Sequence, residues 1–162
     1  MSADIYREFV ERWVHADFHP FPVKAESLDR LEARFETYLP LAYRECMEKV
    51  GPASAGHALL STIIERDLEI PSVHDFLAPA EAIEVTEGWR EAGLEDDMVA
   101  FATEDSGDLY CFKVVPESEP VPGDATVWYF DHEERSSESL ELLFTEWLKL
   151  YAQINLANRS NA

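Results

Sequence analysis

The chain has 162 residues and a formal net charge of −20, from 33 acidic and 13 basic side chains. Phosphate neutralisation needs clustered Lys and Arg, so this balance argues against direct binding to nucleic acid. The hydrophobic content of 46% is enough for a folded core. No apolar run approaches the ~18 residues of a membrane span, and no signal peptide is visible at the N-terminus.

The acidic charge is concentrated in the middle of the chain. Residues 51–112 carry 14 acidic and 2 basic side chains, a net charge of −12. Such a field attracts a basic partner and speeds its encounter, although the same charge also serves solubility alone. Cys46 and Cys111 lie far apart without metal-ligand spacing, which is typical of buried thiols in a cytosolic protein.

The first 50 residues predict three helices. Apolar residues at four-residue spacing indicate a helix over residues 4–15, which the prolines of the next segment end. A second helix is predicted over residues 27–38, with Ser27 as its N-cap. Pro40 suits the first turn of a third helix, and the Gly51-Pro52 pair stops it.

Residues 53–78 give the weakest structural signal. The apolar run His57–Ile64 fits a buried helix or a strand; its length favours a helix, but periodicity does not decide between them. A loop is predicted between Pro71 and Pro79. Pro79 then opens a further helix that ends at Gly93.

Three aromatic strands are predicted at Met98–Thr103, Leu109–Val115 and Thr126–His132. Gly107 accepts a positive φ, so residues 105–108 are predicted to form a hairpin turn between the first two strands. The proline-rich loop 116–124 resists strand pairing and separates the third strand from them.

A strongly periodic helix is predicted to close the chain from about Leu140, with Ser139 as its cap. Residues 155–162 are predicted to be a frayed tail. The whole pattern predicts an α+β fold, with a small, mainly antiparallel sheet flanked by several helices in one domain over residues 1–154. One face of the closing helix carries its apolar residues: Leu140, Leu143, Phe144, Trp147, Tyr151 and Ile154.

The sequence contains no recognisable catalytic motif. It has no phosphate-binding glycine loop, no Gly-x-Gly-x-x-Gly series and no His-Glu-x-x-His zinc motif. Pro20 argues against a shared helix for His15 and His19. A thiol site built from Cys46, Cys111 and His132 stays open, but both cysteines lie in apolar patterns that favour core packing. We therefore expect no catalytic residue, no metal and no cofactor.

Carboxylates gather at the predicted strand ends, at Asp105, Asp108, Asp131, Glu133 and Glu134. Paired carboxylates can serve acid–base chemistry or hold a cation. Carboxylates are so frequent in this chain that a solvated or partner-facing acidic rim is favoured over catalysis. For Asp108 the alternative is a hydrogen bond to the turn that it follows.

Aromatic side chains alternate with these acids along the predicted strands. Alternation places Trp128 and Phe130 on one face of the sheet and Val127 and Tyr129 on the other. One face packs under helices, and the other is either partly open or covered as well. An open face with Tyr or Trp beside acidic groups suits an interface hot spot.

Four motifs follow one another along the chain: Leu39-Pro40 with Tyr43, the strand Val99–Thr103 leading through Gly107-Asp108 to Phe112, the strand Val127–Glu133 with its acidic, His-bearing tip, and Ser139–Phe144. This ordered set resembles the SUKH superfamily, named partly for yeast regulators of cell-wall assembly and killer-toxin resistance, the Smi-Knr-like proteins. The chain departs from family members that place Asn-Gly after the Leu-Pro helix, where it has Val50-Gly51-Pro52.

The resemblance implies an α+β fold and a binding role. Bacterial members are generally viewed as immunity proteins that neutralise toxins, many of them nucleases. We therefore predict a cytosolic, non-enzymatic immunity protein, monomeric or weakly dimeric, that binds a basic toxin domain. The predicted contact residues are Trp89, Asp105, Asp108, Tyr110, Asp131, His132, Glu133 and Glu134.

Two other functions are carried as alternatives. The first is a regulatory or scaffold adaptor, as the yeast relatives suggest. The second is a metal-dependent hydrolase that uses the tip Asp131-His132-Glu133. Stoichiometric bound metal would favour the hydrolase over both binding roles.

Overall fold

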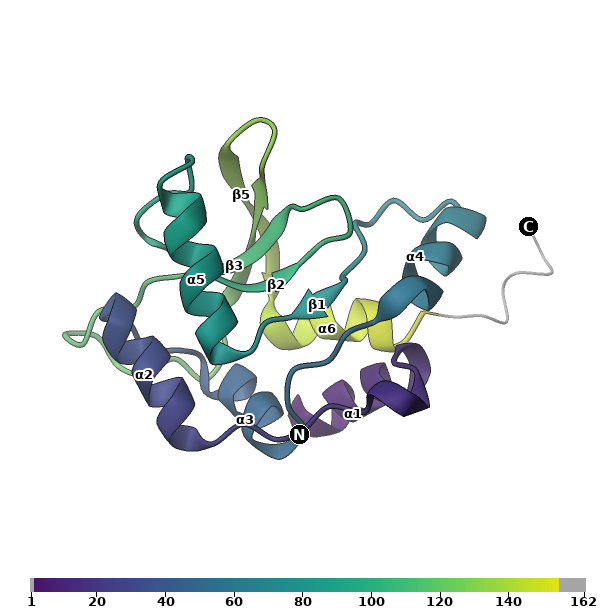
Figure 1. The fold of residues 1–162 in the computed structure, drawn as a ribbon, viewed down its shortest axis with the longest axis horizontal. Helices are drawn as coiled ribbons and strands as arrows, with labels where there is room; N and C mark the ends of the chain where they lie inside the picture. Colours follow the sequence, from purple (N-terminus) through teal and green to yellow (C-terminus); the bar gives the residue numbers. More distant parts are fainter. Residues whose placement is uncertain (1, 155–162) are drawn as a thin grey trace.

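The computed structural model describes residues 2–154, so the predicted tail 155–162 lies outside the described residues. Its helices surround one twisted sheet (Figure 1). The helices are α1 (Ser2–Trp13), the short η1 (Ala16–Phe18), α2 (Ala25–Phe35), α3 (Leu41–Lys49), α4 (Gly56–Glu65), α5 (Pro79–Arg90) and α6 (Phe144–Ala152). The strands are β1 (Asp75–Phe76), β2 (Met98–Thr103), β3 (Leu109–Lys113), β4 (Thr126–Asp131) and β5 (Ser136–Leu143).

The three predicted N-terminal helices are present, but the predicted cap of α2 is wrong. This helix begins at Ala25, with Lys24 in the N-cap position, so Ser27 lies inside the first turn. It ends at Phe35, and Glu36 is its C-cap. The φ of Glu36 is 49°, a left-handed value, and its backbone N–H reaches carbonyls of the last turn. Ser27 is followed by the first buried apolar residue, which made it resemble a cap, whereas the helix starts two residues earlier, at the exposed Ala25.

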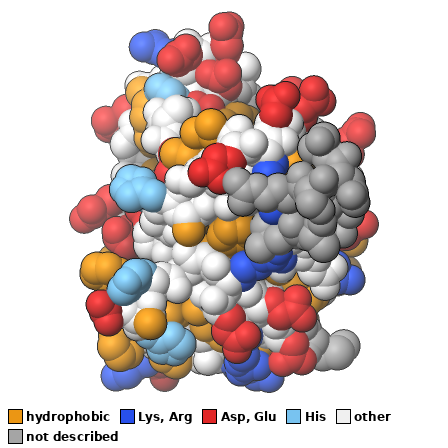
Figure 2. All heavy atoms as spheres, turned by 90° about the vertical axis from the view of Figure 1, so that its right-hand side faces the viewer, with side chains coloured by type: hydrophobic (Ala, Val, Ile, Leu, Met, Phe, Trp, Pro, Cys, Tyr) orange, Lys and Arg blue, Asp and Glu red, His pale blue; other side chains and the backbone are white. Residues whose placement is uncertain are grey.

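The ambiguous segment after α3 is a helix, as its length favours. α4 projects at the right of Figure 1, on the side that faces the viewer in Figure 2. It buries only Leu59 and Ile63 against the rest of the molecule. Pro79 opens α5 as predicted, because a proline at the first helical position lacks only an N–H that would have no partner there.

The sheet is antiparallel throughout, with its strands in chain order from β1 to β5. The hairpin turn between β2 and β3 is confirmed: Gly107 has a φ of 110°, and the Glu104 N–H donates to the Asp108 carbonyl at 2.9 Å. The predicted loop between Pro71 and Pro79 contains the two-residue strand β1, which pairs with the end of β2.

The predicted start of the closing helix is wrong. Ser139, Leu140 and Leu143 belong to β5, and α6 begins only at Phe144. The Glu146 carboxylate accepts a hydrogen bond from the Leu143 N–H at 2.9 Å and so fixes the point where strand turns into helix. The leucines have helical spacing, but pairing with β4 satisfies the backbone of both strands, and this long-range gain outweighs the local pattern.

Helices cover both faces of the sheet. α6 lies on one face with α1 behind it, and its Trp147 meets Phe101 at 5.5 Å and Tyr110 at 4.8 Å between ring centroids. α5 lies on the other face, where the Thr86 hydroxyl accepts a hydrogen bond from the Ala100 N–H at 3.0 Å. Burial of these aromatic rings supplies most of the driving force for packing the layers.

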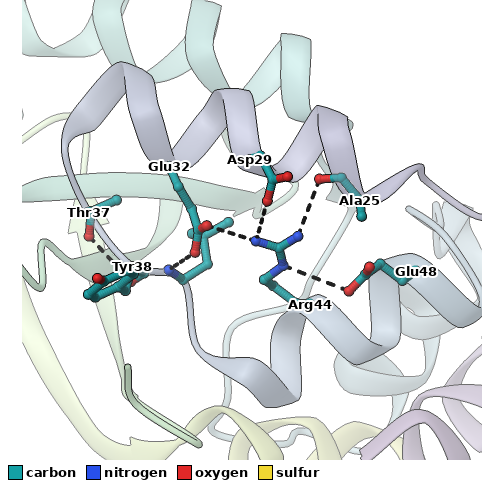
Figure 3. Close-up of polar contacts among 8 residues, drawn as sticks. Ala25, Asp29, Glu32, Thr37, Tyr38, Arg44 and Glu48 are labelled. Carbon is teal, nitrogen blue, oxygen red and sulfur yellow. Dashed lines mark hydrogen bonds and ion pairs between the residues drawn. The ribbon is translucent and has the colours of Figure 1, made fainter. Parts of the chain in front are cut away.

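A cluster of ion pairs around Arg44 connects α2 to α3 (Figure 3). The Arg44 guanidinium from α3 contacts Asp29 at 2.9 Å and Glu32 at 2.7 Å on α2. The second oxygen of Glu32 accepts from the Leu39 N–H at 2.7 Å, where the chain enters α3. Only 15% of the Arg44 side chain is exposed, so this charge is held between the helices rather than displayed to a partner.

Candidate functional site

Two hairpin turns lie side by side at one end of the sheet. Residues 104–108 connect β2 to β3, and residues 131–135 connect β4 to β5. Strand pairing of Leu109 with Phe130 brings the turns together, and the His132 N–H donates to Asp108 Oδ1 at 3.0 Å. We call these two segments the tip. It contains six acidic residues: Glu104, Asp105, Asp108, Asp131, Glu133 and Glu134.

Asp108 holds the tip together from its centre. Its carboxylate is buried and accepts hydrogen bonds from the Tyr129 hydroxyl and from His132, whose Nδ1 lies 2.5 Å from Oδ1. Burial alone would raise the pKa of Asp108, but these hydrogen bonds outweigh it and lower the pKa. In turn, the hydrogen bond that His132 donates to Asp108 raises the pKa of His132 and favours its charged form. Asp108 was predicted as a contact residue. Its carboxylate also has a structural role, because it holds the neighbouring turn 131–135 rather than its own turn 104–108.

The His132 ring is enclosed on two sides. Trp89 from α5 approaches it edge-to-face, with 5.9 Å between ring centroids. On the other side it passes over Gly107, where an added Cβ would lie 3.6 Å from the ring. Trp89 also contacts Phe130 at 5.8 Å, so α5, β4 and the turn meet around one half-buried indole.

The side chain of Asp105 contacts the segment that precedes β1. It contacts His74 Nδ1 at 2.9 Å and accepts a hydrogen bond from the Ser72 hydroxyl. Since Ser72 bonds to the aspartate and not to the histidine, these three residues lack the wiring of a nucleophilic triad. Asp105 therefore anchors the segment before β1 to the tip and keeps only 16% of its side chain exposed.

Tyr110 lies in the core, although it was predicted among the contact residues. Its side chain is fully buried, and its hydroxyl donates to the Ser72 carbonyl at 2.7 Å. Strand alternation points it toward α6, on the face away from Trp89. Tyr110 supports the tip from beneath and offers no surface to a partner.

Arg135 is an exposed base of the tip, and the exposed acids beside it are Glu133 and Glu134. Asp131 fixes them, because its Oδ1 accepts from the Glu133 N–H at 2.9 Å and from the Glu134 N–H at 3.0 Å. The two glutamates therefore project from a turn of defined shape.

Two contributors, Tyr129 and Glu95, are not among the predicted site residues. Tyr129 donates its hydroxyl to Asp108, and alternation along its strand could have placed it beside that residue. Glu95 contacts the Ser137 hydroxyl at 2.5 Å, which brings the exposed acidic loop 95–97 beside β5. This pairing depends on β5, which has no clear signal in the sequence.

Within the described residues, one group of side chains offers donor atoms close enough for a metal ion: Asp108, Asp131 and His132, all within 4.8 Å of one another. Both oxygens of Asp108 and Nδ1 of His132 are already engaged in hydrogen bonds to each other or to Tyr129. The arrangement therefore serves to shape the turn. The cysteines are buried, and burial raises the pKa of Cys46 to about 12, which keeps it as an unreactive thiol.

No described helix is both long and apolar enough to cross a bilayer. No curated protein matches the sequence. A family model, the SMI1 / KNR4 family (SUKH-1), matches residues 22–150, which include the sheet, the tip and every described helix except α1, η1 and the last residues of α6. The chain belongs to the SMI1 / KNR4 family (SUKH-1).

Proposed function

We propose that this protein is a non-enzymatic binding protein that neutralises a basic toxin domain, such as a nuclease, through its acidic tip. One observation carries the proposal: two adjacent turns fix six carboxylates at one end of the sheet in a chain of net charge −20. A basic nuclease domain needs Lys and Arg to hold phosphates, and a preformed acidic surface can occupy those groups instead.

The tip supplies the three properties that an inhibitory surface needs. Glu133 and Glu134 provide exposed charge that steers a cationic partner. Asp131 and Asp108 hold the turn in one conformation, so little entropy is lost on binding. Trp89 offers partly exposed aromatic area beside the charges, as is typical of interface hot spots.

Binding to the product of the neighbouring gene tests this function. We expect a basic domain encoded next to this chain to co-purify with it, to bind more tightly than micromolar at moderate salt, and to lose its toxic activity in the complex. Capture of many endogenous proteins without inhibition of any toxin would instead support a regulatory or scaffold adaptor. Absence of any basic partner above micromolar affinity would contradict the proposal.

A further inference from the structure

A groove lies away from the tip. It runs between the end of α1 with η1 and the beginning of α4, and its volume is about 590 Å³. Small-molecule sites commonly have volumes of about 300–1,000 Å³ and mostly apolar walls with a few polar groups. Figure 2 shows histidine and hydrophobic side chains together on this side of the molecule.

The walls of the groove are largely apolar. Trp13 and Val14 come from the end of α1, and Ala55 and Ala58 from the beginning of α4. Phe18 of η1 stands at the mouth with 72% of its surface exposed. Trp13 and Ala55 are already buried, so the apolar surface that a flat or flexible apolar group would remove from water belongs to Val14, Ala58 and Phe18.

The polar groups of the groove are cationic or neutral. Arg12, His15 and His57 line it, and no acidic side chain does so among the described residues, although the chain has 33 acidic residues. The Arg12 guanidinium is fixed over the Trp13 ring at 5.3 Å and donates to the carbonyls of Ala152, at 2.8 Å, and Ile154. Both of these acceptors are neutral, and no carboxylate in the described part of the chain forms an ion pair with Arg12.

Backbone N–H groups add to this positive environment. α4 begins at Gly56, its N-cap Ala55 has no side-chain hydrogen bond, and its first turn contains no acidic residue. The first amides of α4 therefore have no side-chain acceptor, and the backbone at Gly56, which lines the groove with His57 and Ala58, is left-handed with a φ of 60°. The His15 ring also lines the groove: its Nδ1 accepts from the Asp17 N–H at 3.1 Å and lies 3.6 Å from the Asp17 carboxylate, which leaves Nε2 as the donor of the neutral ring.

We propose that this groove binds a small apolar carboxylate, a free acid with an aromatic or aliphatic tail. The carboxylate lies near Arg12, His57 and the first amides of α4, and the tail lies along Ala58 and Phe18. The complementarity between a cationic groove and an anionic ligand carries this inference, because the net charge of the protein otherwise repels anions. The site shares no residue with the tip and is independent of the proposed function.

Titration with 4-phenylbutyrate tests the ligand class, with 4-phenyl-1-butanol as a neutral probe of nearly the same shape. We expect saturable binding of 4-phenylbutyrate at one site by calorimetry, with amide shifts in the NMR spectrum centred on Gly56, His57 and Ala58. The alcohol should bind about tenfold more weakly or worse, because it lacks the charge-assisted hydrogen bonds. Equal binding of the two probes, or no binding of the acid at millimolar concentration, would overturn the inference.

Two variants locate the site on the exposed surface of α4, where folding is least affected. His57→Glu puts a negative charge in the groove, and Ala58→Trp fills it; we expect each to weaken binding about tenfold or more. His19→Glu is the matched control, because His19 is exposed but does not line the groove, and it should leave the affinity unchanged. Equal losses in His19→Glu and His57→Glu would show a general charge effect and contradict a defined site, as would unchanged affinity in Ala58→Trp.

Discussion

At the scale of single residues, Asp108 is the side chain on which the tip depends. One buried carboxylate serves three donors: the Tyr129 hydroxyl, the His132 N–H and His132 Nδ1. Removal of its charge leaves these groups with a weaker acceptor in a buried place. The carboxylate therefore orders a turn that exposes two acids, Glu133 and Glu134, and one base, Arg135.

We expect Asp108→Asn to lower the free energy of unfolding by about 1–3 kcal/mol, since hydrogen bonds to charged groups contribute about this much. Chemical denaturation of the variant and the wild type measures the difference. Asp96→Asn is the control, because Asp96 is an exposed residue of loop 95–97 and its replacement should change stability by less than about 0.5 kcal/mol. An Asp108→Asn variant as stable as the control would show that the carboxylate does not hold the turns.

The Asp108–His132 pair also predicts a pH dependence. The pKa of Asp108 lies below 3.8 in the folded state, so its contribution is present above that value and is lost as the pH falls through the lowered pKa. The pKa of His132 is raised above 6.5, so its contribution is present below 6.5 and is lost as the pH rises through the raised pKa. The pair is therefore most stabilising between about pH 4 and pH 6.5.

A comparison of wild type with His132→Gln isolates this effect, because other titrating groups cancel in the difference. We expect the wild type to exceed the variant in melting temperature by more at pH 5.5 than at pH 8.5. NMR titration should place the pKa of His132 above 6.5 in the wild type and nearer to that ordinary value in Asp108→Asn. A melting-temperature difference that is the same at both pH values would exclude an ionic contribution of this pair.

At the scale of elements, the helices of the N-terminal half were the easiest to predict. Their signals are local: apolar spacing in α1, a proline before α3 and a proline at the start of α5. β5 shows the opposite case. Its leucines and the apolar face of α6 form one continuous helical pattern, and only pairing with β4, a long-range contact, divides the segment at Leu143. The two-residue strand β1 also depends on a long-range contact, because only its pairing with β2 makes it a strand.

The contact between α2 and α3 gives a prediction at this scale. Arg44→Met keeps the length of the side chain but leaves Asp29 and Glu32 facing each other without their cation. We expect a loss of about 2–4 kcal/mol, because removal of one partner leaves a partly buried charge without compensation. Arg34→Met is the matched control: the Arg34–Glu87 pair is exposed, and such pairs contribute about 0–1 kcal/mol. Equal losses in the two variants, measured by urea denaturation, would contradict a special role for Arg44.

At the scale of the whole molecule, the sequence predicted which turns meet but not which of their side chains face outward. The acids of the predicted site do gather, because antiparallel hairpins with similar strand lengths end at one edge of the sheet. Asp108 and Tyr110 are nevertheless buried, since their orientation depends on how far each strand extends and on which face each helix covers. The groove beside α4 was beyond prediction, as it is formed by segments about 40 residues apart, near His15 and His57.

The account rests on docking of a basic partner at the tip, and the affinity of a charge-reversed tip tests it most directly. Glu133→Lys/Glu134→Lys changes the net charge as much as Glu117→Lys/Glu119→Lys, whose residues are exposed in the distant loop 116–124. With the basic toxin domain that we propose as its partner, we expect the tip variant to weaken binding at least about 30-fold and the loop variant less than about threefold, with both differences shrinking at high salt. Equal weakening by the two variants would contradict docking at the tip and leave only a general attraction between opposite charges.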